Sequence, residues 1–303
     1  MKLIKPSFEI IKQGNTLPEI YQHIEKCGKI CYKSEHTIKE GSAEKFCNMI
    51  ADKGHLSVME HGTIYLKFPV SDPNTHTHNT RFKKYLRNPY SKVNVTRSHY
   101  YVTTNMRVLV EHRWLEDLQF ISEPTKHHYK RITVKFVCDR GILAEFTRHR
   151  VFSFSCESTR YCNYNLGRFG GITFIIPNWS NIQPGEYEQY DSTHYSYYPD
   201  INTDLKKTID VDNDGNCTNA DDEFIQSLFE SEYRYNRMIT CYDWKPQQAR
   251  NILPLATKCE LMMTGFVKDW IHFFKLRNDS TAHPQAIELA KPLEEKFQRL
   301  NLI

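Results

Sequence analysis

The 303-residue sequence contains no apolar run that approaches the roughly 20 residues needed to cross a bilayer. Its opening residues, Met-Lys-Leu-Ile-Lys-Pro, lack the apolar core of a secretory signal. Neither sign of charge dominates, because 40 Lys and Arg oppose 36 Asp and Glu and leave a formal net charge of +4. A membrane protein is therefore disfavoured, whereas the mild positive charge permits anionic ligands such as nucleotides without requiring a nucleic-acid partner.

The sequence also lacks the cysteine patterns typical of disulfide frameworks and zinc sites. Nine cysteines are an odd number, and no second pair follows Cys27 and Cys31 at zinc spacing. Without a secretory signal, we expect these cysteines to be reduced thiols in a cytoplasmic protein. We also expect no bound metal.

The composition, with 40% apolar and 25% charged residues, is that of a globular chain with a sizeable core. The apolar spacing predicts a mixed α/β fold. Helices are predicted over residues 17–33, 42–53, 105–121, 221–242, 256–276 and 284–299. Strands are predicted over residues 63–70, 100–103, 131–138 and 171–176. Asp139 is the expected N-cap of a further helix that contains Glu145 and Phe146.

Residues 71–98 are polar and basic, which predicts a long surface excursion. Aromatic residues alternate there with cations, a pattern that could follow the backbone of a single-stranded nucleic acid. The residues concerned are Arg81, Phe82, Lys83, Lys84, Tyr85, Arg87, Tyr90, Lys92 and Arg97. We favour the alternative, a solvated loop, because charged segments of this kind usually face water.

Residues 199–222 form a second, acidic interruption of the pattern. Positions one, three, five, six and twelve of an EF-hand-like loop would be Asp210, Asp212, Asp214, Gly215 and Asp221. Position twelve normally carries a glutamate, and Cys217 stands at position eight in place of an aliphatic residue. A solvated acidic insertion is therefore preferred to a calcium site.

Residues 148–161 contain a concentrated cationic cluster. Its charged members are Arg148, His149, Arg150 and Arg160, with Ser158 and Thr159 as neutral donors beside the last of them. Guanidinium groups bind phosphate in a planar, forked geometry and stay charged at any working pH. Arginines on a solvated face are the alternative, but the interleaved Phe152, Phe154 and Tyr161 favour a ligand site.

With their spacing, these residues resemble the signature of the flavin-dependent thymidylate synthases, an Arg-His-Arg triplet followed at a fixed distance by Ser-x-Arg-Tyr. Two distant segments agree with this resemblance. Residues 54–61, Gly-His-Leu-Ser-Val-Met-Glu-His, are similar to a Gly-His-x-(Ser/Thr)-x-x-Glu-His segment of that family. Residues 249–255, Ala-Arg-Asn-Ile-Leu-Pro-Leu, are similar to its Ala-Arg-x-x-Leu-Pro-Leu segment, and a helix ending at Arg277 follows.

The resemblance implies a single catalytic domain over residues 1–303, with helices around a central sheet and surface insertions near 71–98 and 199–222. It also implies a homotetramer whose active sites combine several chains, with no nucleic-acid or membrane partner. The implied reaction transfers a methylene group from methylenetetrahydrofolate to dUMP and reduces it with reduced FAD. Its products are dTMP and tetrahydrofolate, NADPH restores the reduced flavin, and no cysteine adduct to uracil is needed.

The resemblance assigns the catalytic role to Arg277, whose guanidinium would stabilise negative charge developing on the uracil ring. A salt bridge that closes a helix is the structural alternative for Arg277, and a surface salt bridge is the alternative for Arg250. The implied dUMP contacts are Glu145, Arg148, Cys156, Ser158, Thr159, Arg160, Arg250 and Arg277. Ser158 is assigned to binding, since a serine nucleophile needs an adjacent base.

The implied FAD contacts are Ser57, Arg148, His149, Arg150, Cys156, Lys268 and His272, because basic groups suit the pyrophosphate and the reduced ring. His55 matches a histidine on the folate side of the pocket. Three positions depart from the family pattern. Cys156 stands where Gln or Glu is common, Phe266 replaces an Asn flavin contact, and Lys268 replaces an Arg. Cys156 is expected to be a small buried residue and not a nucleophile.

Overall fold

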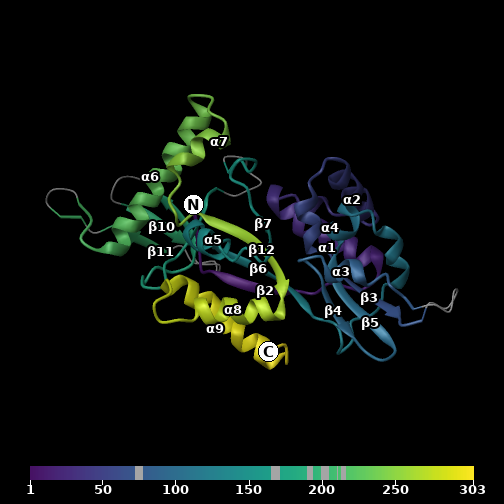
Figure 1. Cartoon of the computed structure of the whole chain (residues 1–303). Helices are drawn as coiled ribbons and strands as arrows, with labels where there is room; N and C mark the ends of the chain where they lie inside the picture. The colour runs from purple at the N-terminus through teal and green to yellow at the C-terminus, as the bar shows by residue number, and fades with distance from the viewer. Residues whose placement is uncertain (72–77, 165–170, 190–193, 199–204, 210, 213–215) are drawn as a thin grey trace.

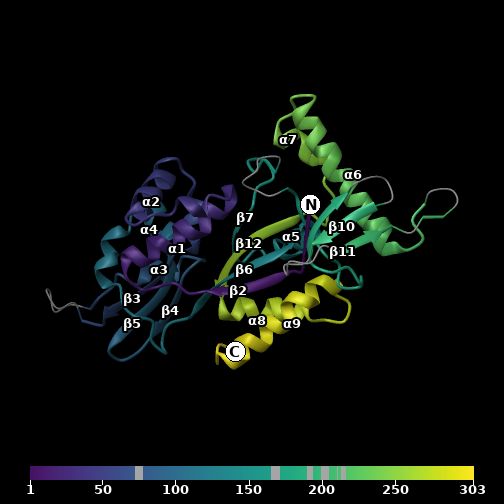
Figure 2. The same ribbon diagram turned by 180° about the vertical axis from the view of Figure 1, so that it is seen from behind.

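The structure, a computed structural model, describes residues 1–71, 78–164, 171–189, 194–198, 205–209, 211–212 and 216–303. Within these residues the chain forms three β-sheets with helices packed against them, which confirms the mixed α/β prediction. Figures 1 and 2 show the N-terminal part of the chain, purple to blue, beside the larger remainder. The strands β2, β6, β12 and β7 lie where the two parts meet.

The strands are β1 Lys2–Ile4, β2 Ser7–Ile11, β3 Thr63–Pro69, β4 Lys92–Val95, β5 His99–Asn105, β6 Arg131–Asp139, β7 Ser153–Cys156, β8 Thr173–Ile175, β9 Gly185–Gln189, β10 His194–Tyr198, β11 Leu205–Thr208 and β12 Lys258–Phe266. The α-helices are α1 Leu17–Lys29, α2 Ser42–Asp52, α3 Lys83–Leu86, α4 Met106–Glu111, α5 Arg140–Phe146, α6 Ala220–Thr240, α7 Pro246–Ala249, α8 Val267–Arg277 and α9 Pro284–Arg299. The strand orders are β2-β6-β12-β7, β11-β10-β9-β1-β8 and β3-β5-β4.

The four-stranded sheet is antiparallel throughout, and its central strand β12 pairs with β6 on one side and β7 on the other. One face packs on α5, α8 and α9 in a core rich in aromatic rings. The largest fully buried members are Phe136, Phe146, Trp270, Phe273, Phe274 and Phe297. This core positions α5, β7 and α8, which carry several of the predicted site residues.

The prediction of one helix over residues 256–276 is wrong for its first half. Residues 258–266 form β12, and the helix α8 begins only at Val267. Leu261, Met262 and Met263 are all at most 2% exposed because both faces of this central strand are covered. A strand buried on both faces has a continuous apolar run, which periodicity alone does not distinguish from a buried helix.

Asp139 is the N-cap of α5, as predicted, since its Oδ1 accepts the Ile142 N–H at 2.8 Å. The cap ends β6 and turns the chain into a seven-residue helix. The helices predicted over 221–242 and 284–299 are confirmed as α6 and α9. The strand predicted over 171–176 is the shorter β8, which runs parallel to β1.

In the N-terminal part, α1 and α2 pack over the three-stranded sheet β3-β5-β4. Ile20, Ile24 and Cys27, predicted to share a buried face of the first helix, are at most 1% exposed. The predicted strands at 63–70 and 100–103 correspond to β3 and β5. The helix predicted over 105–121 is interrupted, because α4 ends at Glu111, Arg113 takes a positive φ of 58° and a separate 3₁₀ helix covers Leu115–Phe120.

The prediction that residues 71–98 form a surface excursion holds only in part. Residues 72–77 lie outside the described residues, but Tyr85 is fully buried and its hydroxyl donates to Asp117 Oδ2 at 2.6 Å. Phe82 stacks on Tyr100 with ring centroids 3.7 Å apart, and β4 extends the sheet. The cations of this segment conceal an aromatic face that completes the local core. Because these two rings are buried, they are not available to stack on nucleic-acid bases.

The prediction of an acidic insertion over 199–222 falls partly on residues outside the description, among them Asp210, Asp214 and Gly215. The described part includes β11, which pairs with β10 at the edge of the five-stranded sheet. Asp221 Oδ2 accepts the Asn181 N–H at 2.9 Å, so this carboxylate has a structural partner. The preference for a solvated acidic insertion over a calcium site therefore stays a prediction.

Among the described residues, no helix combines the length and the apolar character needed to cross a membrane.

A buried polar network joins the N-terminal part to the four-stranded sheet. His61 Nδ1 lies 2.8 Å from Thr264 Oγ1, and its Nε2 lies 3.0 Å from Ser155 Oγ. His23 Nε2 lies 3.0 Å from Thr133 Oγ1, which in turn contacts Thr264 Oγ1 at 2.7 Å. Burial lowers the pKa of His61 to about 3 and that of His23 to about 4, so both rings are neutral at pH 7.

Because these two histidines are buried in the neutral form, the fold should lose stability at acidic pH. Below pH 6.5 or so the unfolded chain binds a proton on each ring, whereas the folded chain does not until the pH approaches 4. The unfolding free energy should therefore fall by about 3 kcal/mol per histidine between pH 6.5 and pH 4. Urea denaturation at a series of pH values measures this. In His61→Gln the pH slope should be shallower, whereas the exposed His55→Gln should keep the slope of the unmodified protein; equal slopes in all three would contradict the assignment.

Candidate functional site

The segment after β7 is held in place by main-chain bonds to two different elements. The Glu157 N–H donates to Glu260 O on β12 at 2.9 Å, and the Ser158 N–H donates to Cys31 O at 3.1 Å. Because side chains alternate along a strand, Cys156 and Glu157 point to opposite faces of the sheet. The predicted site residues 158–160 therefore leave the sheet edge from a fixed starting point.

Thr159 is the centre of the cationic cluster. Its buried Oγ1 accepts from Arg140 Nη2 at 2.9 Å and from Arg250 Nη1 at 3.2 Å. Arg140 is the first residue of α5, and Arg250 follows α7, so the hydroxyl joins two elements that are far apart in sequence. The two guanidiniums converge on a neutral oxygen, which leaves their charges available to an anion.

Arg160 lies beside this pair. Its Nε donates to Gln247 Oε1 at 3.1 Å. Gln247 belongs to α7, and Arg250 is the first residue after that helix. The Arg160 guanidinium also lies over the Tyr161 ring at 5.1 Å. The structure thus brings Ser158, Thr159, Arg160 and Arg250 into one neighbourhood, as the resemblance implied.

The exposed arginines of the signature, together with Arg250, have no carboxylate partners among the described residues. The described arginines that form ion pairs are Arg81, Arg107, Arg234 and Arg277. Three arginines of the signature, Arg148, Arg150 and Arg160, are exposed, and so is Arg250. Within the described chain, no carboxylate pairs with any of these four, so an anionic ligand would not have to displace an internal partner.

Arg277 occupies a separate, more enclosed position at the end of α8. Its Nη1 contacts Glu145 Oε2 at 2.5 Å, its Nη2 donates to Glu145 O at 2.6 Å, and its Nε donates to His149 Nε2 at 2.9 Å. The side chain is only 15% exposed. These three bonds fix the plane of the guanidinium, so the helix-closing salt bridge considered from the sequence is present.

His149 must be neutral for this arrangement, because its Nε2 accepts a hydrogen bond from a guanidinium. Burial, together with the charges of Arg277 and His272, lowers the pKa of His149 to about 4. Its ring lies against Phe273 and 6.4 Å from the His272 ring. His149 therefore acts as a hydrogen-bond acceptor that orients Arg277.

Arg150 points to a different cavity, of about 370 Å³, that also contains Phe266. Phe266 lies beside two cations, with Arg131 at 5.5 Å and Lys92 at 5.8 Å from its ring centroid. Arg131 is half-buried, and its partial removal from water lowers its pKa to about 10. Phe266 thus forms an aromatic wall of this cavity, with two cations beside its ring.

The remaining predicted residues lie at the surface of single elements. Ser57 and His55 belong to the beginning of the 3₁₀ helix Leu56–His61 and are exposed, as are Lys268 and His272 on α8. Among the described residues, no hydrogen bond or ion pair joins the Arg277 group to the group around Thr159. Helix α5 connects the two groups, because its first residue, Arg140, contacts Thr159 and its sixth residue, Glu145, contacts Arg277.

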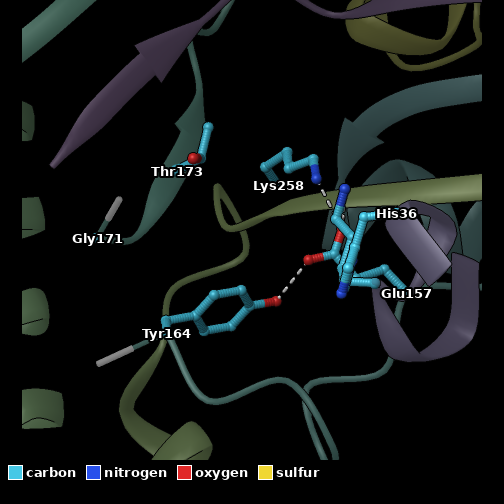
Figure 3. A pocket seen from close by; sticks show the side chains of 7 residues that line it. His36, Glu157, Tyr164, Gly171, Thr173 and Lys258 are labelled. Atoms are coloured by element: carbon cyan, nitrogen blue, oxygen red, sulfur yellow. Dashed lines mark hydrogen bonds and ion pairs between the residues drawn. The ribbon is translucent and has the colours of Figure 1, made fainter. Parts of the chain in front are cut away.

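A cavity of about 490 Å³ lies on the other face of β12, lined by Lys33, His36, Glu157, Tyr164, Gly171, Thr173 and Lys258. Figure 3 shows the Tyr164 hydroxyl and the Lys258 ammonium directed at Glu157. These contacts measure 2.9 Å and 2.7 Å. Burial raises the pKa of the Tyr164 hydroxyl, with the Glu157 charge adding to the effect.

The carboxylates behind this cavity belong to a network of three lysines and two glutamates. Lys258 also contacts Glu260 at 2.7 Å, Lys135 contacts Glu260 at 2.5 Å, and Lys33 forms a short ion pair with Glu260. Burial alone would raise the pKa of Glu260, but Lys258 and the other ammonium groups lower it. Burial would likewise lower the pKa of Lys258, but Glu157 and Glu260 raise it. Glu260 and Lys258 are therefore both charged at neutral pH.

Sequence reasoning did not find Arg140, Lys258 or Lys33. Arg140 directly follows the predicted helix cap and so was identifiable as a cation at a helix start, but its contact with Thr159 depends on the sheet. Lys258 lay within the segment wrongly predicted to be helical. Lys33 lies about 120 residues before Glu157, and no periodicity connects the two. In the described part of the chain, no group of three or more His, Cys, Asp or Glu side chains is arranged to hold a metal ion.

A sequence model of the family described as thymidylate synthase complementing protein, Thy1, matches residues 121–300, which is more than half of the chain. The chain belongs to this family. The match includes β6, β7, β12 and helices α5–α9, and with them the Arg148–Tyr161 signature and Arg277. The resemblance at residues 54–61, which includes His55 and Ser57, lies outside the matched residues.

Two curated relatives of this Thy1-family chain are flavin-dependent thymidylate synthases by name. The probable enzyme of Paramecium bursaria Chlorella virus 1 is 26% identical over 166 residues, which are 55% of this chain and 65% of that protein. The enzyme of Synechocystis sp. is 25% identical over 176 residues, with coverage of 55% and 66%. The chain thus spans slightly less than two thirds of the length of either relative.

Solved structures similar to the family member include the UMP/dUMP methylase PolB from Streptomyces cacaoi with 5-Br dUMP. It is 15% identical, with a TM-score of 0.43 and coverage of 99% of this chain and 93% of that chain. Thymidylate synthase X from Helicobacter pylori with FAD and dUMP is 13% identical, with a TM-score of 0.36 and coverage of 95% and 91%. Superpositions at these scores do not locate any site residue of this chain.

The lysine–glutamate network predicts a large stability loss in Glu157→Gln. This change leaves Lys258 in a buried position with one carboxylate fewer, so the unfolding free energy should fall by about 3 kcal/mol. The matched control is Glu230→Gln, which breaks an exposed pair with Arg234 at 2.6 Å and should cost less than about 1 kcal/mol. Chemical denaturation of the two variants measures the difference. Losses of equal size would show that burial of the network does not matter.

Proposed function

We propose that the chain is a flavin-dependent thymidylate synthase that converts dUMP and methylenetetrahydrofolate to dTMP and tetrahydrofolate, with FAD as cofactor and NADPH as reductant. Family membership supports the reaction class. The observation that carries the proposal further is the set of guanidiniums without carboxylate partners around Thr159. Such a set suits a dianionic phosphate, which accepts several charge-assisted hydrogen bonds at once.

The residues of the chain fit both anionic ligands. Arg160 and Arg250, with the hydroxyls of Ser158 and Thr159, would bind the dUMP phosphate. Arg148 and Arg150 are exposed cations suited to the FAD pyrophosphate, and His149, Lys268, His272 and Ser57 complete the proposed flavin contacts. His55 is assigned to the folate side.

Arg277 is the proposed catalytic residue. Its guanidinium is oriented by Glu145 and His149 before any ligand binds, so little reorganisation is needed when negative charge develops on the pyrimidine. Partial burial strengthens its electrostatic effect, because fewer water molecules screen the charge. Reduced FAD, when bound, would supply the hydride that converts the transferred methylene to a methyl group.

Glu145 has a second consequence for substrate binding. Its carboxylate is engaged by Arg277 and is therefore a weaker direct contact for dUMP than the sequence suggested. We assign it the orientation of Arg277 as its main role. Cys156, half-buried at the end of β7, replaces a longer polar side chain and would leave room beside the nucleotide.

The proposal includes a homotetramer in the cytoplasm. A single chain holds the Arg277 group and the Thr159 group at opposite ends of α5, with Ser57 and His55 on a third element. Association of several chains is the proposed means by which these groups surround one nucleotide. All nine cysteines are free, which suits a reducing compartment. We propose no nucleic-acid or membrane partner.

The function is tested by flavin content and by product formation. Purified protein, or protein supplied with FAD, should show the flavin absorption bands and form dTMP from dUMP, methylenetetrahydrofolate and NADPH. It should also restore growth of a thymidine-requiring strain. Failure to bind FAD would sink the proposal; FAD binding without dTMP formation would instead indicate a flavoprotein that has lost synthase activity.

The two arginine groups should respond differently to mutation. Arg277→Ala removes charge stabilisation of the transition state, so kcat should fall by about 100- to 1000-fold. Arg160→Ala removes a charged hydrogen bond to the phosphate, so KM for dUMP should rise by about ten- to a hundredfold with a smaller change in kcat. Steady-state kinetics measure both, with the exposed Arg234→Ala as control. Equal, small effects of the first two changes would contradict the assigned roles.

A further inference from the structure

Three cysteines lie in a row across the four-stranded sheet, on the face that carries α5. Cys138 on β6 is directly opposite Cys259 on β12, and Cys156 on β7 is opposite Leu261. Since Leu261 and Cys259 are two residues apart on the same strand, their side chains share one face, and Cys156 and Cys259 are diagonal neighbours. The exact placement follows from the strand register and does not depend on a loop.

The surroundings of these sulfurs are cationic. Arg140 Nη1 lies 3.1 Å from Cys259 Sγ, so a full positive charge stabilises any negative charge on the pair. The neighbouring Cys259 thiol, together with Arg140, outweighs burial and lowers the pKa of Cys156, whereas the pKa of Cys259 is raised. Cys156 is thus the member of the pair with the larger thiolate fraction, and the thiolate is the reactive form of a cysteine.

The accessibility of the three thiols differs. Cys138 and Cys259 are at most 1% exposed, whereas Cys156, at the end of its strand, is only half-buried. A small oxidant therefore meets Cys156 first, and the sulfur nearest to it in the sheet belongs to Cys259. A reactive, accessible thiol beside a second buried thiol is the arrangement of a redox-sensitive pair.

We propose that Cys156 and Cys259 form a reversible oxidation site that responds to peroxides. The Cys156 thiolate attacks one peroxide oxygen, the O–O bond breaks, and a sulfenic acid and hydroxide (or an alcohol, from an organic peroxide) result. The Cys259 thiol then attacks the Cys156 sulfur, an S–S bond forms, and water leaves with the Cys259 proton. Two thiols are oxidised by two electrons in total, one peroxide is reduced, and a dithiol or thioredoxin-like reductant reverses the step.

The disulfide would alter the cationic cluster. Diagonal neighbours have Cα atoms about 7–8 Å apart, whereas a disulfide requires less than about 7 Å, so the end of β7 must move towards β12. That movement displaces residues 157–160 directly after it. Bond formation also removes the Cys259 sulfur from Arg140, which holds Thr159 by its other nitrogen. We infer that oxidation weakens dUMP binding, and this inference rests on the proposed function.

The bond itself is tested without any assay of activity. The purified protein is treated with hydrogen peroxide, its remaining thiols are alkylated, and proteolytic peptides are analysed by mass spectrometry. A Cys156–Cys259 cross-linked peptide that disappears after dithiothreitol is the expected result. Overturning results are a Cys138–Cys259 bond, over-oxidation of Cys156 with Cys259 still alkylated, or modification of the exposed Cys241 alone.

Two variants separate the proposal from incidental oxidation. In Cys259→Ala, the same treatment should stop at a Cys156 sulfenic acid, detected with dimedone; in Cys241→Ser, the cross-link should form as in the unmodified protein. If Cys259→Ala does not fold, the peptide map of the unmodified protein still decides. An unchanged cross-link yield is expected for Cys241→Ser, and its loss would overturn the assignment.

The functional consequence is measured by dUMP affinity of the reduced and the oxidised protein. The dissociation constant should increase at least severalfold on oxidation and return after dithiothreitol. If the reduced protein does not bind dUMP, the proposed function fails while the disulfide stands. If the reduced protein binds dUMP and the cross-linked protein binds it equally well, the regulatory inference fails while the proposed function stands.

Discussion

Two buried carboxylates, Glu157 and Glu260, hold the site segment against the central sheet. Each would be unstable alone, because the removal of an ionised group from water costs several kcal/mol. Lys33, Lys135 and Lys258 compensate them, and Lys33 comes from the N-terminal part of the chain. The network therefore joins both parts of the molecule and fixes the residue that immediately precedes Ser158. The geometry of this network therefore determines where the hydrogen-bond donors of residues 158–160 point.

On the opposite face of the same strands, the electrostatic arrangement is reversed. There the cations of the Thr159 group converge on a hydroxyl and have no internal carboxylate among the described residues, whereas Arg277 is paired and oriented. One group is thus suited to receive an anion from outside, and the other is suited to act on a ligand that is already bound. The alternation of side chains along β7 and β12 keeps the two charge systems apart.

Much of the fold and of the site could be predicted from the sequence, because spacing, capping and the signature motif are local signals. The Asp139 cap, the α1 face and the C-terminal helices follow from spacing and capping, and the signature of residues 148–161 led to the family. The strand β12 was missed because its two buried faces give no alternation, and the burial of Tyr85 was missed because lysines surround it. Arg140, Lys33 and Lys258 could not be assigned, since their partners are distant in sequence and depend on strand order.

The length of α5 has a consequence for how the two groups of the site can meet. Arg140 and Glu145 are five residues apart, which corresponds to about 7.5 Å along the helix axis. The helix is a rigid spacer between the threonine hydroxyl and the oriented guanidinium, packed on one side by the aromatic core. Within one chain, the helix therefore holds the Thr159 group and the Arg277 group at a fixed spacing. Only the association of chains could bring the Thr159 group of one chain closer to the Arg277 group of another.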